Sequence, residues 1–166
     1  ILSPSHSHLL DKHRHIDIVE MLHPVQSQEP TIQIEVISPE VRGIGSKRYV
    51  DYTIKVKTTL PIFSQNESIV HRRYSDFEWL HKELSYADTK IAVPSLPAKA
   101  WQRQLPFRND NGRFQEDFIE DRRQGLEVFI NKVAVHPLAQ NERALHVFLF
   151  EPEIDLTKYV RGKINK

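Results

Sequence analysis

Alternation of apolar and polar residues marks three candidate strands in the first half of the chain. The first strand is predicted to begin at Thr31, and Ser38-Pro39 should end it. A turn-rich stretch with Gly43 and Gly45 separates it from the second strand. Short connections between consecutive strands favour an antiparallel meander. The first two runs alternate at Ile32, Ile34 and Val36 and at Tyr52, Ile54, Val56 and Thr58, and the third run holds Ile69, Val70 and Tyr74.

Helical spacing replaces this alternation in the second half. Ser75 and Glu78 form a capping-box pattern, so a helix should start at Ser75 or Asp76. A longer helix is predicted from about Gln115 to His136, stopped by Pro137, and a third helix follows it. Their apolar positions are Phe77, Leu80 and Leu84, then Phe118, Leu126, Phe129, Ile130 and Val133, and finally Leu145, Phe148 and Leu149. Strands followed by helices predict an α+β fold, a three-stranded antiparallel meander packed on a three-to-four-helix subdomain.

Composition divides the 166 residues into a tail and one domain. Residues 1–30 hold five of the nine histidines, three prolines and no aromatic residue, which predicts a mobile N-terminal tail. Residues 31–164 are long enough to bury a core of their own. The histidine pairs His6/His8 and His13/His15 have i,i+2 spacing, which lacks the ligand geometry of known metal motifs. We therefore expect no metal site.

Charge and residue types exclude several function classes. The net charge is only +1, and residues 70–123 hold ten basic against nine acidic residues, which argues against a nucleic-acid groove. The absence of cysteine excludes disulfides and thiol chemistry and suits the cytosol. No apolar run reaches the ~18 residues of a membrane span, and no basic stretch followed by an apolar one reads as a secretory signal, so we expect any membrane role to be peripheral. The signatures of phosphate loops and of common hydrolases are also absent, which argues against an enzyme.

The predicted second helix carries one charge inside its apolar stripe. Arg122 lies four residues after Phe118 and four before Leu126, where a charged side chain needs an anionic partner. Two interpretations stay open at this stage. Arg122 either forms a structural ion pair with Glu78 or Asp76, or it closes the floor of an anion pocket.

A basic cluster, His71-Arg72-Arg73-Tyr74, ends the predicted third strand just before the helix start. Neighbouring strand residues point to opposite faces, so only one of Arg72 and Arg73 can face inward. An arginine beside a helix start offers charge and a planar fork for phosphate, while Tyr74 offers a flat face for a ring such as inositol. An exposed basic strand edge is the alternative.

Residues 91–114 are predicted to form a Pro-rich and membrane-facing loop. Val93-Pro94-Ser95-Leu96-Pro97 favours an extended, polyproline-like path. Residues 95–108 then combine three basic residues with aromatic and aliphatic ones and contain no acidic residue, as in a loop that enters lipid headgroups. The expected membrane-inserting residues are Trp101, Arg103, Leu105, Phe107 and Arg108. A loop that packs its aromatic residues on its own domain is the alternative.

Three segments, taken in order and spacing, resemble the signature segments of PX (phox-homology) domains. The wider match covers roughly residues 31–164 and is similar to the short PX-only sorting nexins, although the first 30 residues are not. The three segments are Arg72-Arg73-Tyr74-Ser75-Asp76-Phe77, Val93-Pro94-Ser95-Leu96-Pro97-Ala98-Lys99 and Phe118-Ile119-Glu120-Asp121-Arg122-Arg123-Gln124-Gly125-Leu126.

This resemblance implies the PX fold and a cytoplasmic adaptor, peripheral on early endosome membranes, that binds phosphatidylinositol 3-phosphate. It also implies retromer-type coat and cargo proteins as partners, with no cofactor. By motif position, Arg73 would hold the 3-phosphate, Tyr74 would stack under the inositol ring, Lys99 would meet the 1-phosphate and Arg122 would clasp the 4- and 5-hydroxyls. Arg72, Ser75 and Arg123 would support the site. A protein-interaction scaffold with a weak or lost lipid pocket is the alternative function.

Some positions depart from the family pattern. The family often has Gly where Ala98 stands, Pro where Ser95 stands and a basic residue where His71 stands. An imidazole gains charge in mildly acidic solution, so His71 predicts tighter lipid binding at lower pH. Phosphorylation of Ser75 would place close to two negative charges where the lipid phosphate docks.

Overall fold

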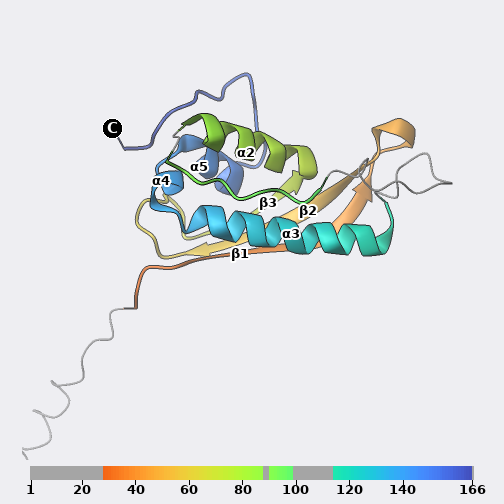
Figure 1. Cartoon of the computed structure of the whole chain (residues 1–166), viewed down its shortest axis with the longest axis horizontal. Coiled ribbons are helices and arrows are strands. Elements are labelled where there is room, and N and C mark those ends of the chain that lie inside the picture. Colours follow the sequence, from red (N-terminus) through yellow and green to blue (C-terminus); the bar gives the residue numbers. More distant parts are fainter. Residues whose placement is uncertain (1–27, 88–89, 99–113, 166) are drawn as a thin grey trace, which may run out of the picture.

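The computed structural model describes residues 28–87, 90–98 and 114–165, and these form a three-stranded sheet followed by helices (Figure 1). This order of elements confirms the predicted α+β fold. The elements are β1 (Ile32–Arg42), η1 (Gly45–Lys47), β2 (Tyr49–Thr58), β3 (Glu67–Arg73), α2 (Tyr74–Ala87), α3 (Glu116–Ala134), α4 (Pro137–Gln140) and α5 (Arg143–Phe150).

The sheet is an antiparallel meander with the strand order β1-β2-β3. Val36 lies opposite Ile54, and Ile54 lies opposite Val70, so these three apolar positions, one from each strand, share one face. These side chains are buried, whereas Ile69 is 67% exposed on the other face. The alternation in the sequence therefore identified the core face of β1 and β2 correctly, whereas in the predicted third strand Ile69 faces the other way and Tyr74 belongs to α2.

The first strand extends beyond its predicted end. Ser38-Pro39 does not stop β1, which continues to Arg42. The register shifts between Ile37 and Glu40, and Ser38 has a φ of 50°, so the chain bulges at this point and then resumes its pairing with β2. A proline is tolerated at a bulge in an edge strand because its missing N–H breaks no ladder bond there.

The helix start also differs from the sequence prediction. α2 begins at Tyr74, directly after β3, so Ser75 lies in its first turn and not at a cap. Oδ2 of Asp76 accepts a hydrogen bond from the Arg73 backbone N–H at 2.8 Å. The carboxylate of Asp76 thus takes part in the change from strand to helix, because it binds a backbone N–H just ahead of the first turn.

The helices cover one face of the sheet and build most of the core. α3 lies along β1, while α5 packs against α2 and β3 (Figure 1). α3 ends at Ala134, and Pro137 then occupies the first position of α4, where a proline costs no hydrogen bond. Within the described part of the chain, no helix has the length and apolar character needed to cross a bilayer.

The C-terminal segment after α5 returns across α2. Glu83 of α2, only 7% exposed, accepts two hydrogen bonds from Arg161 at 2.7 and 2.9 Å and one from Tyr159 at 3.1 Å. The Tyr159 ring also meets Trp79 edge-to-face, with the ring centroids 5.0 Å apart. This segment is therefore fixed to α2 by a bidentate, charge-assisted contact and an aromatic pair.

Candidate functional site

The two adjacent arginines at the end of β3 point in opposite directions. Arg72 is 2% exposed and faces the helices. Its guanidinium donates hydrogen bonds to carbonyls at and beyond the end of α5 and to the carbonyl of His71. The other four partners are Val147 and Phe148 in α5 and Glu151 and Pro152 directly after it. Burial lowers the pKa of Arg72 to about 10, which still leaves it charged at neutral pH. Any support that Arg72 gives to the candidate site is therefore indirect, through the end of α5.

Arg73 lies on the opposite face and keeps 56% of its side chain exposed. Its Nε is 4.0 Å from Oδ1 of Asp76, and its guanidinium carbon lies 5.7 Å from the centre of the Tyr49 ring. Burial raises the pKa of Asp76, although the hydrogen bond from the Arg73 N–H opposes that rise. Asp76, one of the two candidate partners for Arg122, contacts Arg73. The i,i+3 spacing of Arg73 and Asp76 was the feature of the sequence that could have indicated this contact.

Tyr74 and Arg122 are stacked on each other. The guanidinium carbon of Arg122 lies 3.9 Å from the centre of the Tyr74 ring and 4.6 Å from that of Phe118. An arginine in the apolar stripe is tolerated here because aromatic faces attract the delocalised charge. The geometry thus joins two of the residues selected from the sequence, and Tyr74 follows Arg73 directly. We call this group the Arg73–Tyr74–Arg122 cluster.

The same two side chains hold the Pro-rich segment, residues 93–98. The Tyr74 hydroxyl donates to the carbonyl of Pro97 at 2.6 Å, and Nη2 of Arg122 donates to the carbonyl of Ala98 at 3.1 Å. These bonds attach the Pro-rich segment to the cluster immediately before Lys99 in the sequence. Lys99 itself lies outside the described residues, as do the predicted inserting residues Trp101, Arg103, Leu105, Phe107 and Arg108.

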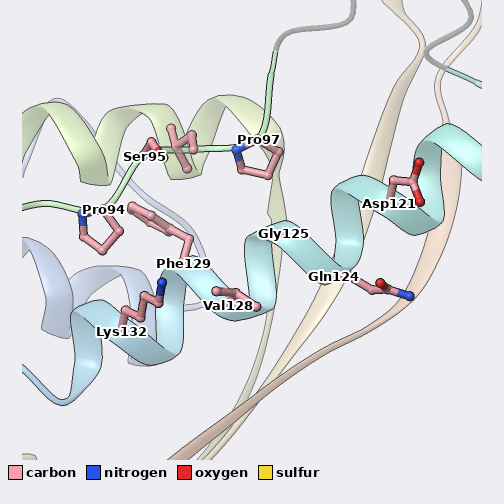
Figure 2. A pocket seen from close by; sticks show the side chains of 10 residues that line it. Pro94, Ser95, Pro97, Asp121, Gln124, Gly125, Val128, Phe129 and Lys132 are labelled. Carbon is pink, nitrogen blue, oxygen red and sulfur yellow. The ribbon is translucent and has the colours of Figure 1, made fainter.

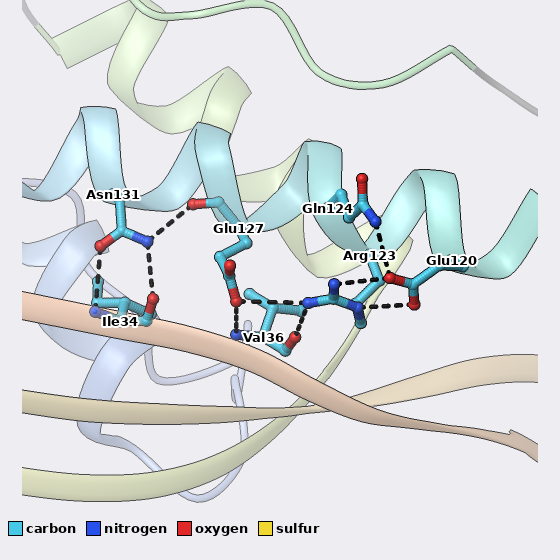
Figure 3. Close-up of polar contacts among 7 residues, drawn as sticks. All are labelled: Ile34, Val36, Glu120, Arg123, Gln124, Glu127 and Asn131. Carbon is cyan, nitrogen blue, oxygen red and sulfur yellow. Dashed lines mark hydrogen bonds and ion pairs between the residues drawn. The ribbon is translucent and has the colours of Figure 1, made fainter.

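Arg123, the neighbour of Arg122, connects α3 to the sheet (Figure 3). It forms two hydrogen bonds with Glu120, at 2.7 and 2.8 Å, and one with the carbonyl of Val36 at 2.8 Å. The hydrogen bonds that Glu120 accepts from Arg123 and Gln124 lower its pKa to about 2. Asn131 binds both the N–H and the carbonyl of Ile34. The polar side chains of α3 therefore pair with the outer edge of β1, and Arg123 helps to fix α3 against that strand.

A buried tyrosine that the sequence analysis did not select lies near Arg122. Tyr52 of β2 is fully buried, and among the described residues its hydroxyl has no hydrogen-bond partner. Burial raises the pKa of Tyr52 to about 12, while the charge of Arg122 acts in the opposite direction. The alternation of β2 marked Tyr52 as a core residue, but no pattern in the sequence places it close to Arg122.

His71 belongs to a separate charged group beside Arg73. Its Nδ1 is 3.1 Å from Oδ2 of Asp51, and the same oxygen accepts a hydrogen bond from Nε of Arg42 at 3.0 Å. Asp51 lies directly opposite Arg73 in the register of β2 and β3. His71 therefore lies close to Arg73, and its predicted effect, tighter lipid binding at lower pH, stays a prediction. Over the described ranges, no three histidine or acidic residues gather as they would around a metal ion.

A groove of about 580 Å³ runs between the Pro-rich segment and α3 (Figure 2). Its lining comes from one side of the Pro-rich segment and the outer face of α3, and it does not include the members of the Arg73–Tyr74–Arg122 cluster. The groove and the cluster are therefore different surfaces. The lining residues are Pro94, Ser95, Leu96, Pro97, Asp121, Gln124, Gly125, Val128, Phe129 and Lys132.

Comparison with known proteins gives a consistent picture. The family model described as "PX domain" matches residues 60–152. Human sorting nexin-12 is 57% identical over 135 residues, which are 81% of this chain and 82% of that protein. Human sorting nexin-3 is 57% identical over 133 residues, covering 80% and 81% of the two chains. The X-ray structure of a designed CISK-PX domain matches with a TM-score of 0.55 and 35% identity, over 70% of this chain and 97% of that one.

Proposed function

The chain belongs to the PX domain family, among the sorting nexins, and from this premise we propose that it is an adaptor that binds phosphatidylinositol 3-phosphate. In this proposal it acts at the surface of early endosomes and supports protein sorting with a retromer-type coat. It recognises membranes and proteins and does not catalyse a reaction.

The observation that carries the proposal is the stacking of Arg122 on Tyr74, the residue that follows the exposed Arg73 in the sequence. Two guanidinium groups and one aromatic face suit a phosphorylated sugar-like ring, because the guanidinium fork binds phosphate and the ring face packs against the inositol. The Arg73 guanidinium makes a 4.0 Å contact with the Asp76 carboxylate and keeps 56% of its side chain exposed, so a phosphate competes with a weak ion pair at Arg73.

Each member of the cluster has a separate role in this proposal. Arg73 holds the 3-phosphate, Tyr74 lies under the inositol ring, and Arg122 binds the 4- and 5-hydroxyls. Lys99 meets the 1-phosphate, and the sequence supports this role because Lys99 follows the carbonyl that Arg122 holds. Trp101, Leu105 and Phe107 enter the headgroup region, with Arg103 and Arg108 attracted to anionic lipid.

Vesicle flotation with each mono- and polyphosphorylated phosphoinositide tests the proposal. The expected result is selective flotation with phosphatidylinositol 3-phosphate, lost in Arg73→Ala and weakened in the double variant Leu105→Ala/Phe107→Ala. Lys158→Ala is a matched control, because it removes one positive charge from a largely exposed side chain in the C-terminal segment. It should float like the wild type.

The alternative, a protein-interaction scaffold with a lost pocket, predicts a different outcome. A folded chain that floats with none of the lipids would contradict the lipid proposal and favour the scaffold. Equal flotation with all polyanionic lipids, unchanged in Arg73→Ala, would also contradict it, because binding would then follow charge alone.

A further inference from the structure

A glycine stands where the Pro-rich segment touches α3 (Figure 2). A Cβ atom built on Gly125 would lie 2.5 Å from Cγ of Pro97 and 3.3 Å from its Cβ. Carbon atoms in normal contact are roughly 3.5–4.0 Å apart, so a Cβ atom 2.5 Å from Cγ of Pro97 would overlap with it severely. The proline ring closes on its own backbone nitrogen and cannot turn away as a flexible side chain does. A side chain at position 125 would therefore push the Pro97 backbone away from α3.

The backbone of α3 does not itself require glycine at this position. Gly125 lies inside α3 and is not among the described glycines with positive φ, which are Gly43, Gly45 and Gly162. Glycine in a helix interior lowers stability relative to alanine. The close approach of Pro97 is thus the feature of the structure that accounts for glycine here.

Pro97, which packs against Gly125, belongs to the same short backbone segment that Tyr74 and Arg122 bind. Tyr74 donates to the carbonyl of Pro97 at 2.6 Å, and Arg122 donates to the carbonyl of Ala98 at 3.1 Å. Gly125 follows Arg122 by three residues, less than one helical turn. Moving Pro97 outward would stretch both hydrogen bonds and change the positions of the Tyr74 ring and the Arg122 guanidinium.

We propose that Gly125 is a positioning residue for phosphoinositide recognition: its missing side chain lets Pro97 dock on α3 and so fixes Tyr74 and Arg122. The inference rests on the proposed function, since the ligand is the same inositol phospholipid. In this inference Gly125 does not contact the lipid and acts on the site through Pro97 and Ala98.

The test compares Gly125→Ala with the wild type in vesicles of phosphatidylcholine containing phosphatidylinositol 3-phosphate. We expect about tenfold weaker binding from Gly125→Ala, as for the loss of one well-placed hydrogen bond. Circular dichroism should show an intact fold, because alanine favours the helix. Val128→Ala is the matched control, one turn further along α3, 54% exposed and in the same groove, and it should bind like the wild type.

Rescue separates positioning from a general loss of structure. Pro97→Ala removes Cγ, the ring atom that overlaps, so the double variant Gly125→Ala/Pro97→Ala should bind more tightly than Gly125→Ala alone. In the absence of lipid, the NMR signals of the Arg122 side-chain Nε–H and the Tyr74 amide should shift in Gly125→Ala and move back in the double variant.

The outcomes distinguish this inference from the proposed function. If Gly125→Ala binds lipid as tightly as the wild type, the inference is wrong and the proposed function stands. The same holds if Gly125→Ala weakens lipid binding and the added Pro97→Ala substitution does not restore it. A wild-type chain that binds no phosphoinositide overturns the proposed function and the lipid role of Gly125 together. The lipid-free NMR signals then still decide whether Gly125 positions Tyr74 and Arg122.

Discussion

Replacing Arg72 with methionine should strongly destabilise the fold, although the chain carries a second arginine next to it. Methionine keeps the length and apolar stem of the side chain but has no donors. Arg72 makes five hydrogen bonds to backbone carbonyls, four of them at or just beyond the end of α5. Its loss leaves these carbonyls without their shared donor in a buried place, where an unsatisfied group is costly.

The size of the effect follows from two opposing contributions. Five bonds to a charged donor at a net ~1.5 kcal/mol each favour the native residue. Burial lowers the pKa of Arg72 to about 10, so removing the buried charge returns about 3 kcal/mol. The expected net loss is about 4 kcal/mol, which corresponds to a melting temperature lower by roughly 10 °C for a domain of this size.

Chemical denaturation of the wild type, Arg72→Met and Arg73→Ala measures how much each arginine contributes to the free energy of unfolding. Arg73 is largely exposed and its one carboxylate contact is 4.0 Å long, so Arg73→Ala should change stability by less than about 1 kcal/mol. Arg73→Ala should nevertheless abolish lipid binding. A loss below about 1 kcal/mol for Arg72→Met would refute the reasoning that the Arg72 guanidinium secures the end of α5.

Three further predictions concern other parts of the molecule. Glu83→Ala should release the C-terminal segment from Arg161 and lower stability by about 2 kcal/mol, with faster limited proteolysis after residue 151; unchanged proteolysis would contradict this. Burial lowers the pKa of His146 below its ordinary value of 6.5, so its contribution to stability is present above pH 6.5 and is lost as the pH falls through the folded-state value. Thermal unfolding at pH 7.5 and 5.0 should therefore show an acid loss that His146→Gln reduces, and an equal loss in both proteins would exclude this origin. Ser75→Glu should weaken capture by vesicles with phosphatidylinositol 3-phosphate, because Ser75 is exposed in the first turn of α2 beside Arg73; normal capture would remove the idea of a phosphorylation switch.

Much of the fold was predictable because burial follows the alternation of side chains. Val36, Ile54 and Val70 lie in the core as their spacing indicates. The end of β1 was predicted wrongly at Ser38-Pro39, since a proline stops a strand only where the ladder needs its N–H. At the bulge in β1 the ladder does not need the N–H that Pro39 lacks. A single sequence does not indicate where such a bulge lies.

The unusual environment of Arg122 was predictable because this residue breaks a local rule. Arg122 interrupts an apolar stripe, and the structure places it on the Tyr74 ring. The inward direction of Arg72 depends on the register of β3, which the sequence left open between two neighbours. The role of Gly125 arises from contact with Pro97, far away in the sequence, so no local pattern indicates it.

Direct observation of the cluster during lipid binding tests the central claim most sharply. A soluble short-chain phosphatidylinositol 3-phosphate would be titrated into the isotope-labelled chain, with NMR detection of the side-chain Nε–H of Arg73 and Arg122 and the amide of Tyr74. The account predicts saturable shifts at all three residues, and far weaker ones with the 4-phosphate isomer. Shifts confined to the groove around Lys132, or equal shifts with both isomers, would contradict a pocket specific for the 3-phosphate.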